Sequence, residues 1–248
     1  MGSNPNIISK LPDAGTSIFA VMSKMANEYK AINLSQGFPD FNCSEELVDL
    51  VHHFMKNNFN QYAPMPGTID LRKQISHKVN RDYGHYYYAE KEITVTAGAT
   101  QALYTAFSAI INNGDEVIIF EPAYDSYIPA IVANGGIPIS IKLSADDFSI
   151  PWKEVEKAIT KNTKCIVINS PHNPTGAILN VSGILQLQQI VKNTNIFLIS
   201  DEVYEHIIFD NQEHCSFARY DELAKRSFII SSFGKTFHAT GWRVGYCV

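Results

Sequence analysis

Residues 231–237 read Ser-Ser-Phe-Gly-Lys-Thr-Phe and follow the apolar run Phe228-Ile229-Ile230. The apolar run predicts a buried strand, and the small residues after it predict a turn that exposes Lys235. A lysine at its ordinary pKa of about 10.4 is protonated and non-nucleophilic at neutral pH, so a reactive lysine needs burial or a cationic neighbour. Arg243 is a candidate neighbour. We interpret Lys235 as a Schiff-base lysine; an ordinary surface lysine is the commoner alternative for this stretch alone.

Short apolar segments alternate with helical segments through most of the chain. This alternation predicts an α/β fold, in which helices cover both faces of a mostly parallel, seven-stranded sheet. The connection from Phe233 to Trp242 is too short for the helical crossover that joins parallel strands, so the last strand is predicted to be antiparallel. Strands are expected at 93–96, 116–120, 137–143, 165–169, 195–200, 228–230 and 242–248, and helices at 45–58, 68–83, 101–111, 126–133, 152–160 and 181–192.

Composition excludes several classes of protein. The 248 residues, 45% of them apolar, can bury the core of one large domain, or of one domain and part of another. A net charge of −5 with scattered basic residues argues against nucleic acid or anionic lipid as a partner. The four cysteines lie far apart without a C-x-x-C pair, which favours reduced thiols over a zinc site or a disulfide framework. No apolar run approaches the roughly 20 residues of a membrane span, and we expect a cytoplasmic protein.

The residues Ala97-Gly98-Ala99-Thr100 form a small-residue turn between a predicted strand and a predicted helix. A helix N-terminus after such a turn presents free N–H groups and the positive end of the helix dipole to an anion. Ala99 and Thr100 are therefore candidates to bind a phosphate group. A plain turn is the alternative, and the chain has neither G-x-G-x-x-G nor a P-loop motif.

Polar and aromatic residues follow three other predicted strands, where a doubly wound sheet binds its ligands. Tyr124 is placed to stack on a flat ring, although core packing is an equal alternative. Asn173, held between prolines, can donate to a phenolate oxygen, and Tyr204 can share that role. Asp201 directly follows an apolar strand, where a carboxylate is costly unless a cation such as a pyridinium nitrogen pairs with it; a helix N-cap or a metal ligand is the alternative. For His172 we expect no catalytic role.

Three stretches resemble one family of enzymes. Residues 231–246, Ser-Ser-Phe-Gly-Lys-Thr-Phe-x-x-Thr-Gly-Trp-Arg-Val-Gly-Tyr, resemble the lysine motif of class I aminotransferases, which are pyridoxal-phosphate (PLP) enzymes of fold type I. Residues 33–41, Asn-Leu-Ser-Gln-Gly-Phe-Pro-Asp-Phe, and residues 170–176, Ser-Pro-His-Asn-Pro-Thr-Gly, resemble the methionine and kynurenine branch. The resemblance implies an N-terminal arm and part of the small domain at 1–42, and a PLP-binding large domain at 43–248. That domain is expected to be incomplete at its C-terminal end, with the C-terminal small domain absent.

The resemblance also implies a set of contacts to PLP. Lys235 would form the internal aldimine, Tyr124 would stack on the ring and Asp201 would pair with its nitrogen. Asn173 and Tyr204 would bond the 3′-oxygen. The residues implied for the phosphate are Ala99, Thr100, Ser232, Arg243 and, reaching across a homodimer interface from the neighbouring subunit, Tyr62.

The function predicted from this resemblance is transfer of an amino group from an L-amino acid to a 2-oxo acid, without a metal. The substrate would be contacted by Gly37 through its backbone and by Asn173. Methionine, an aromatic amino acid or kynurenine is favoured as the donor by apolar side chains near the arm, namely Ile18, Phe19, Phe38 and Tyr62. Cysteine-conjugate β-elimination on the same scaffold, or a non-catalytic PLP-binding fragment, are the alternatives.

Overall fold

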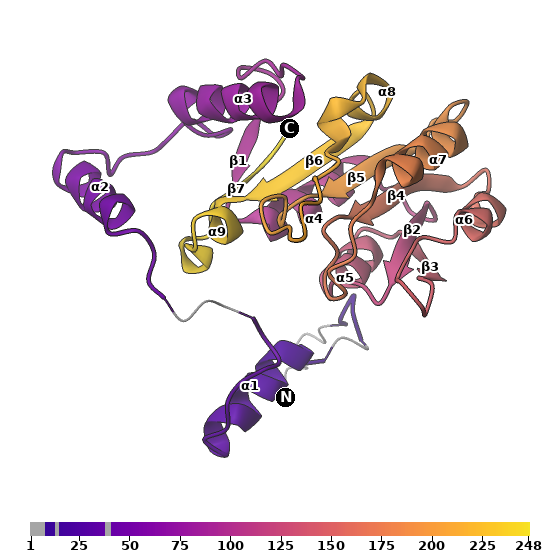
Figure 1. Ribbon diagram of the computed structural model, residues 1–248, viewed down its shortest axis with the longest axis horizontal. Coiled ribbons are helices and arrows are strands. Elements are labelled where there is room, and N and C mark those ends of the chain that lie inside the picture. The colour runs from indigo at the N-terminus through magenta and orange to yellow at the C-terminus, as the bar shows by residue number, and fades with distance from the viewer. Residues whose placement is uncertain (1–7, 13–14, 38–40) are drawn as a thin grey trace, which may run out of the picture. The chain divides into compact units, whose positions relative to one another are not determined.

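The computed structural model describes residues 8–12, 15–37 and 41–248 (Figure 1). Contacts divide the chain into two compact units, Met1–Asn42 and Cys43–Val248. The first unit contains helix α1, Ile18–Glu28, which begins where the Ser17 hydroxyl accepts a hydrogen bond from the Ala20 N–H. Among the described residues, no helix is both long and apolar enough to cross a lipid bilayer.

A seven-stranded sheet forms the centre of the second unit. The strands lie in the order β1-β7-β6-β5-β4-β2-β3, and only β7 runs antiparallel to its neighbours, β1 and β6. The predicted mostly parallel sheet with one antiparallel strand is therefore confirmed. The strands are β1 (Thr94–Thr96), β2 (Glu116–Glu121), β3 (Ile137–Lys142), β4 (Thr163–Asn169), β5 (Phe197–Asp201), β6 (Ser227–Ser232) and β7 (Gly245–Cys247).

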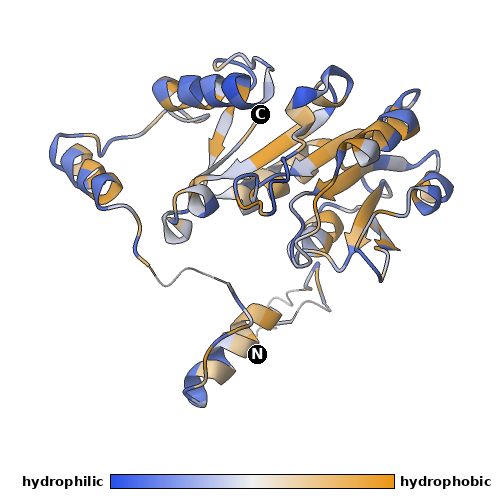
Figure 2. Ribbon diagram, in the orientation of Figure 1, coloured by the Kyte–Doolittle hydropathy of each residue, from blue (hydrophilic) through white to orange (hydrophobic). Residues whose placement is uncertain are grey.

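Helices cover both faces of this sheet (Figure 1). Figure 2 shows that the strands between them are largely hydrophobic, as expected of parallel strands buried on both sides. The helices on the sheet are α3 (Ile69–Tyr83), α4 (Ala99–Ile110), α5 (Tyr127–Ala133), α6 (Trp152–Ala158), α7 (Val181–Val191) and two short ones, α8 (Asp221–Ala224) and α9 (Phe233–Thr236). Helix α2 (Glu45–Lys56) has no buried residue and adds none to either core.

Successive residues of each strand enter different cores, because side chains alternate across a sheet. Ile118 packs in the cluster that includes residues of α3, α6 and α7, whereas Ile119 packs in the cluster that includes residues of α4 and α5. The same alternation separates Ile229 from Ile230 in β6. Side chains of neighbouring residues at the strand ends therefore point to opposite faces of the sheet.

Two local predictions near the C-terminal end are wrong. Lys235 does not lie in an open turn but in α9, a single helical turn that begins directly after β6. The last strand begins at Gly245 rather than Trp242, because Thr240–Trp242 form a 3₁₀ turn and Arg243 has a left-handed φ of 53° that ends it. That conformation lies outside the β region, and β7 starts only after Arg243.

Candidate active site

The predicted site residues of the second unit, apart from Tyr62, gather at one edge of the sheet. Parallel strands all end at the same edge, so the residues that follow β1, β2, β4, β5 and β6 come together there. Strand β7 runs the opposite way and therefore begins at this edge. As a result Arg243, just before β7, lies beside Gly98, just before α4.

Two glycines allow the backbone to approach closely at this edge. A Cβ atom on Gly98, whose φ is 83°, would lie 2.4 Å from Arg243 Nη2. A Cβ atom on Gly245 would lie 2.6 Å from the backbone nitrogen of Ala99. Larger residues would thus push the Arg243 side chain and β7 away from the first turn of α4.

The first turn of α4 and the Arg243 guanidinium together form a group of hydrogen-bond donors, called the α4 cradle. No acceptor among the described residues bonds the N–H groups of Ala99 and Thr100. Arg243 donates a hydrogen bond to the Thr240 carbonyl at 3.1 Å, and the residue is exposed. Ser232, at the end of β6, presents its hydroxyl near the start of α9, where it accepts from the Gly234 N–H at 3.1 Å. Such a collection of N–H and guanidinium donors suits a phosphate group.

Lys235 is held in a partly buried position by the tight turn of α9. A Cβ atom on Gly234 would lie 2.9 Å from Thr240 Cα, so the chain before Lys235 can pack there only as glycine. The Lys235 Nζ lies 5.4 Å from the centre of the Tyr204 ring. Burial, with the nearby Arg243 guanidinium, lowers the pKa of Lys235. Both of the factors that can lower a lysine pKa, burial and a cationic neighbour, are therefore present at this position.

Asp201, at the end of β5, is only 3% exposed. Its Oδ2 accepts a hydrogen bond of 2.6 Å from the Tyr127 hydroxyl, and its Oδ1 accepts a longer one, 3.4 Å, from the Val203 N–H. Burial raises the pKa of Asp201 to about 6, and the Tyr127 hydrogen bond opposes that rise. No cation among the described residues pairs with it. Asp201 is thus a buried carboxyl group that a cationic ligand would stabilise.

Two positioning side chains were missed by sequence reasoning. Tyr127 lies in the predicted helix 126–133, but only the fold brings its hydroxyl to Asp201. Asn169 accepts from the Asn173 N–H at 2.7 Å and donates to the Asp201 carbonyl at 2.9 Å, and so ties the loop 170–176 to β5. Its one sequence signal is a polar residue at the end of an apolar strand, and the register places it opposite Asp201.

The remaining residues are placed as follows. The Tyr124 hydroxyl lies 3.4 Å from Thr100 Oγ1, so Tyr124 belongs to the same group of side chains. His172 turns towards its own loop, where Nδ1 lies 2.8 Å from Thr175 Oγ1, and burial lowers its pKa. Tyr62 is fully exposed between α2 and α3. Gly37 lies in the first unit, and Phe38 lies outside the described residues.

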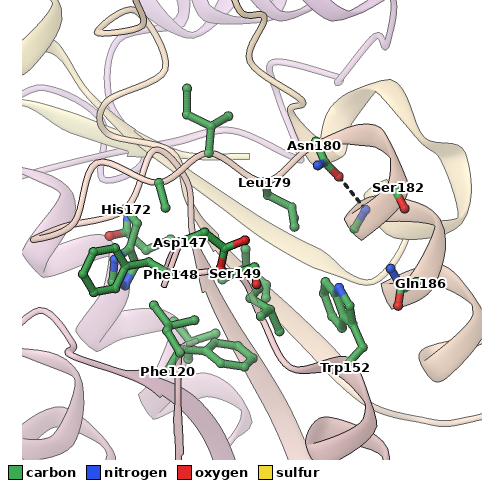
Figure 3. Close-up of a pocket in the computed structure, with 18 of the residues that line it drawn as sticks. Phe120, Asp147, Phe148, Ser149, Trp152, His172, Leu179, Asn180, Ser182 and Gln186 are labelled. Carbon is green, nitrogen blue, oxygen red and sulfur yellow. Dashed lines mark hydrogen bonds between the residues drawn. The ribbon is translucent and has the colours of Figure 1, made fainter. Parts of the chain in front are cut away.

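A cavity of about 390 Å³ adjoins the site behind Tyr127 and Asn169, which both line it. Figure 3 shows Phe120, Phe148 and His172 on one side of this cavity and Trp152 and Gln186 on the other. None of the predicted PLP-contacting side chains lines it. Among the described residues, no three His, Cys, Asp or Glu side chains gather in a group that could hold a metal ion.

Comparison with known proteins gives consistent matches. The sequence profile of the family described as aminotransferase class I and II matches residues 29–248. Methionine aminotransferase of Escherichia coli is 47% identical over 249 residues, which are 100% of this chain and 64% of the relative. A kynurenine–oxoglutarate transaminase of Dictyostelium discoideum is 38% identical over 252 residues, which are 94% of this chain and 58% of the relative.

Solved structures match equally well. A crystal structure from Escherichia coli, described as identifying a methionine aminotransferase function, has a TM-score of 0.94 and 46% identity and covers 99% of this chain and 64% of its own. An aspartate aminotransferase from Rhizobium meliloti has a TM-score of 0.90 and 30% identity, with 99% of this chain and 63% of its own covered. The chain therefore spans less than two-thirds of the length of these relatives.

Proposed function

The chain belongs to the class I and II aminotransferases, and on that basis we propose that it carries the PLP site of an enzyme that moves an amino group from an L-amino acid to a 2-oxo acid. The observation that carries the proposal is the meeting of Lys235, buried Asp201 and the α4 cradle at one sheet edge. We assign 43–248 to the PLP-binding large domain, and 1–42 to the arm and part of the small domain.

The site residues fit PLP group by group. The α4 cradle, with Ser232 and Arg243, supplies donors for the phosphate. Asp201 supplies the buried carboxylate for a protonated ring nitrogen, and Tyr127 holds that carboxylate in place. Tyr124 offers a ring for stacking, and Asn173 and Tyr204 offer donors for the 3′-oxygen. Since each PLP group has a matching partner, these residues are assigned to the cofactor.

PLP, when bound, withdraws electrons from the amino acid and so makes its Cα proton removable. The Lys235 amine would hold the cofactor covalently and, once displaced by the substrate amine, would move that proton as a general base. A lowered lysine pKa suits this task because an uncharged amine can accept a proton. Asp201, as a carboxylate, would keep the ring nitrogen protonated and the electron withdrawal strong.

The amino donor is proposed to be methionine, an aromatic amino acid or kynurenine. One observation in support is the 47% identity to a methionine aminotransferase. A second is a cavity of about 350 Å³ beside Asn173 and Tyr204. Its lining includes Ile207, Ile208 and Phe209, and none of its described lining residues is a lysine or an arginine. A dicarboxylate would need a cation for its second carboxylate. No observation in the described residues or the comparisons favours β-elimination or a non-catalytic role.

Methionine is expected to change the absorption of the PLP-bound protein within one turnover and to release one 2-oxo acid per site when no acceptor is present. Aspartate at the same concentration is the control and is expected to react far more slowly. Release of pyruvate and thiol from a cysteine conjugate in place of this reaction would contradict the proposal. A PLP-bound protein that reacts with none of methionine, an aromatic amino acid and kynurenine would also contradict it.

A homodimer with Tyr62 acting in trans is proposed from the full exposure of that side chain. Tyr62→Phe is expected to weaken PLP binding roughly ten- to a hundredfold, because a hydrogen bond to a charged group contributes about 1.5–3 kcal/mol. A mixture of Tyr62→Phe and Lys235→Ala subunits tests the geometry. At a PLP concentration too low to fill the Tyr62→Phe sites, a trans role leaves half the sites of each mixed dimer intact, and equal mixing restores about a quarter of wild-type activity. Activity no higher than that of Tyr62→Phe alone would place Tyr62 in its own subunit's site.

A further inference from the structure

A second buried carboxylate, Glu205, lies close to the candidate site but on the other face of the sheet. It is 5% exposed. Its side chain receives donors from three separate elements: Lys78 Nζ at 2.7 Å and the Tyr83 hydroxyl from α3, the Ser231 hydroxyl at 2.5 Å from β6, and the Tyr246 hydroxyl at 3.4 Å from β7. These five residues are called the Glu205 cluster below.

The Glu205 cluster is a satisfied ionic group. Burial works to raise the pKa of Glu205, but Lys78, with the Ser231 and Tyr83 hydroxyls, outweighs it and holds that pKa below its usual range. A buried charge is retained only where several donors compensate for its lost hydration. Lys78 also lies 3.6 Å from Asp82 Oδ2, within α3 itself. The hydrogen bonds of the cluster that join α3 to β6 and β7 all pass through the Glu205 side chain.

Three members of the cluster are sequence neighbours of residues at the candidate site. Glu205 follows Tyr204, Ser231 precedes Ser232, and Tyr246 follows Gly245. Ser231 lies opposite Tyr246 in the antiparallel register, and Ser232 lies opposite Gly245. Since side chains alternate across a strand, Ser232 and Gly245 face the α4 cradle while Ser231 and Tyr246 face α3. The cluster thus fixes, from behind, the backbone that carries the cofactor-facing residues.

The neighbouring carboxylate Glu202 does not share this arrangement. It accepts from the Ser200 hydroxyl at 2.7 Å and from the Phe217 N–H at 3.0 Å, and it lies 2.8 Å from His214 Nε2. These contacts hold the segment around 214–217 against β5. Among the described residues, no side chain donates to both Glu202 and Glu205, and the link to β6 and β7 passes through Glu205.

We propose that Glu205 is a positioning residue for PLP, one that holds Tyr204 and Ser232 in place from the opposite face of the sheet. This inference rests on the proposed function, because it assigns Tyr204 to the 3′-oxygen and Ser232 to the phosphate. Glu205 lies on the opposite face of the sheet from the residues assigned to the 3′-oxygen and the phosphate. Its action passes through the backbone of Tyr204 and Ser232.

Glu205→Gln keeps the side-chain shape and removes the charge. The variant is expected to bind PLP at least about tenfold more weakly, because small displacements of positioned groups have large effects. It is also expected to shift upwards the pH at which the absorption of lysine-bound PLP changes. The reason is that a looser Tyr204 stabilises less negative charge on the 3′-oxygen, so the adjacent proton is held more tightly. Equilibrium titration with PLP and a pH series of absorption spectra measure both effects.

Arg226→Met is the matched control. Arg226 lies beside the opposite end of β6, and its Nη1 donates to the carbonyls of Val191, Thr194 and Ile196 at 2.8, 3.0 and 3.2 Å. Its replacement also removes a charged group with several hydrogen bonds from the same strand region. It is expected to lower the Tm while leaving both the PLP affinity and the spectral pH unchanged.

The possible outcomes distinguish failure of the proposed PLP function from failure of the positioning role of Glu205. Wild-type protein that binds no PLP would overturn the proposed function itself. Wild-type protein that binds PLP, together with a Glu205→Gln variant of unchanged affinity and spectral pH, would overturn only the positioning role. Equal shifts in Arg226→Met would do the same. If Glu205→Gln does not fold, Tyr83→Phe and Ser231→Ala remove single donors and are expected to move both readouts in the same directions by smaller factors; unchanged readouts in both variants would overturn the role.

Discussion

Lys235→Ala is expected to lose covalent attachment of PLP and to transfer amino groups at least about 10²–10⁴-fold more slowly, the range that a positioned general acid–base contributes. The variant removes the amine that burial and the Arg243 guanidinium hold at a lowered pKa. Lys235→Arg should be equally inactive, because a guanidinium keeps the charge but is neither a nucleophile nor a base near neutral pH. Single-turnover rates with methionine and the absorption of bound PLP measure the two losses.

A matched control is available in Lys161, which is an exposed lysine on the same unit. Lys161→Ala is expected to retain wild-type absorption and rate. Small primary amines added to Lys235→Ala should restore part of the proton transfer, since Lys235 is only partly buried and the shorter alanine leaves room for an amine. A Lys235→Ala variant with wild-type turnover would show that another group is the base, and the assignment would fail.

Asp201→Asn is expected to have two opposite effects, one on the empty protein and one on PLP. In the protein without PLP, burial raises the pKa of Asp201 from 3.8 to about 6. A carboxyl group with a raised folded-state pKa favours folding while it is protonated. This contribution to the free energy of unfolding is lost as the pH rises from about 4 to about 6. A pKa difference of about two units between the folded and unfolded states corresponds to about 3 kcal/mol.

The asparagine has no proton to lose, and its amide oxygen can still accept from Tyr127. The apoprotein of Asp201→Asn is therefore expected to be more stable than wild type at pH 7 and to lose that advantage towards pH 4. Urea unfolding at a series of pH values measures the difference. A constant difference between pH 4 and pH 7 would contradict the assigned pKa direction.

The affinity for PLP and the transamination rate, in contrast, should fall in Asp201→Asn. A pair of charges about 4 Å apart at an effective dielectric near 20 attract by about 4 kcal/mol, or roughly a thousandfold in affinity or rate. Asp201→Asn is thus expected to lower the transamination rate by up to about three orders of magnitude, by the same estimate. Asp125→Asn, which changes an exposed carboxylate next to Tyr124, is the control and should leave the rate near wild type.

The fold could be predicted because it depends on local signals. Apolar runs of strand length predicted the sheet, and the short connection between Phe233 and Trp242 predicted its antiparallel strand. That connection was also where prediction failed in detail. The left-handed Arg243 and the 3₁₀ turn before it lie where the Arg243 side chain packs beside Gly98, far away in the sequence. No local pattern carries that contact.

Some residues of the candidate site could likewise be predicted from the sequence, and others could not. Lys235, Asn173 and Asp201 stand in motifs that a single sequence displays. Tyr127 and Asn169 could not be recognised, because each acts through a hydrogen bond to Asp201 that exists only once α5 and β4 lie beside β5. Glu205 was harder still to recognise from the sequence, since its donors come from positions as distant as Lys78 and Tyr246.

The central claim is that Lys235 holds PLP, and the most direct measurement is reductive trapping followed by peptide mapping. Borohydride treatment of the PLP-loaded protein should fix the cofactor to one peptide, the one that contains Lys235, in a yield matching the loss of visible absorption. The Asp201→Asn protein, loaded at a higher PLP concentration, should give the same peptide. A label spread over exposed lysines, or PLP released intact after reduction, would contradict the account.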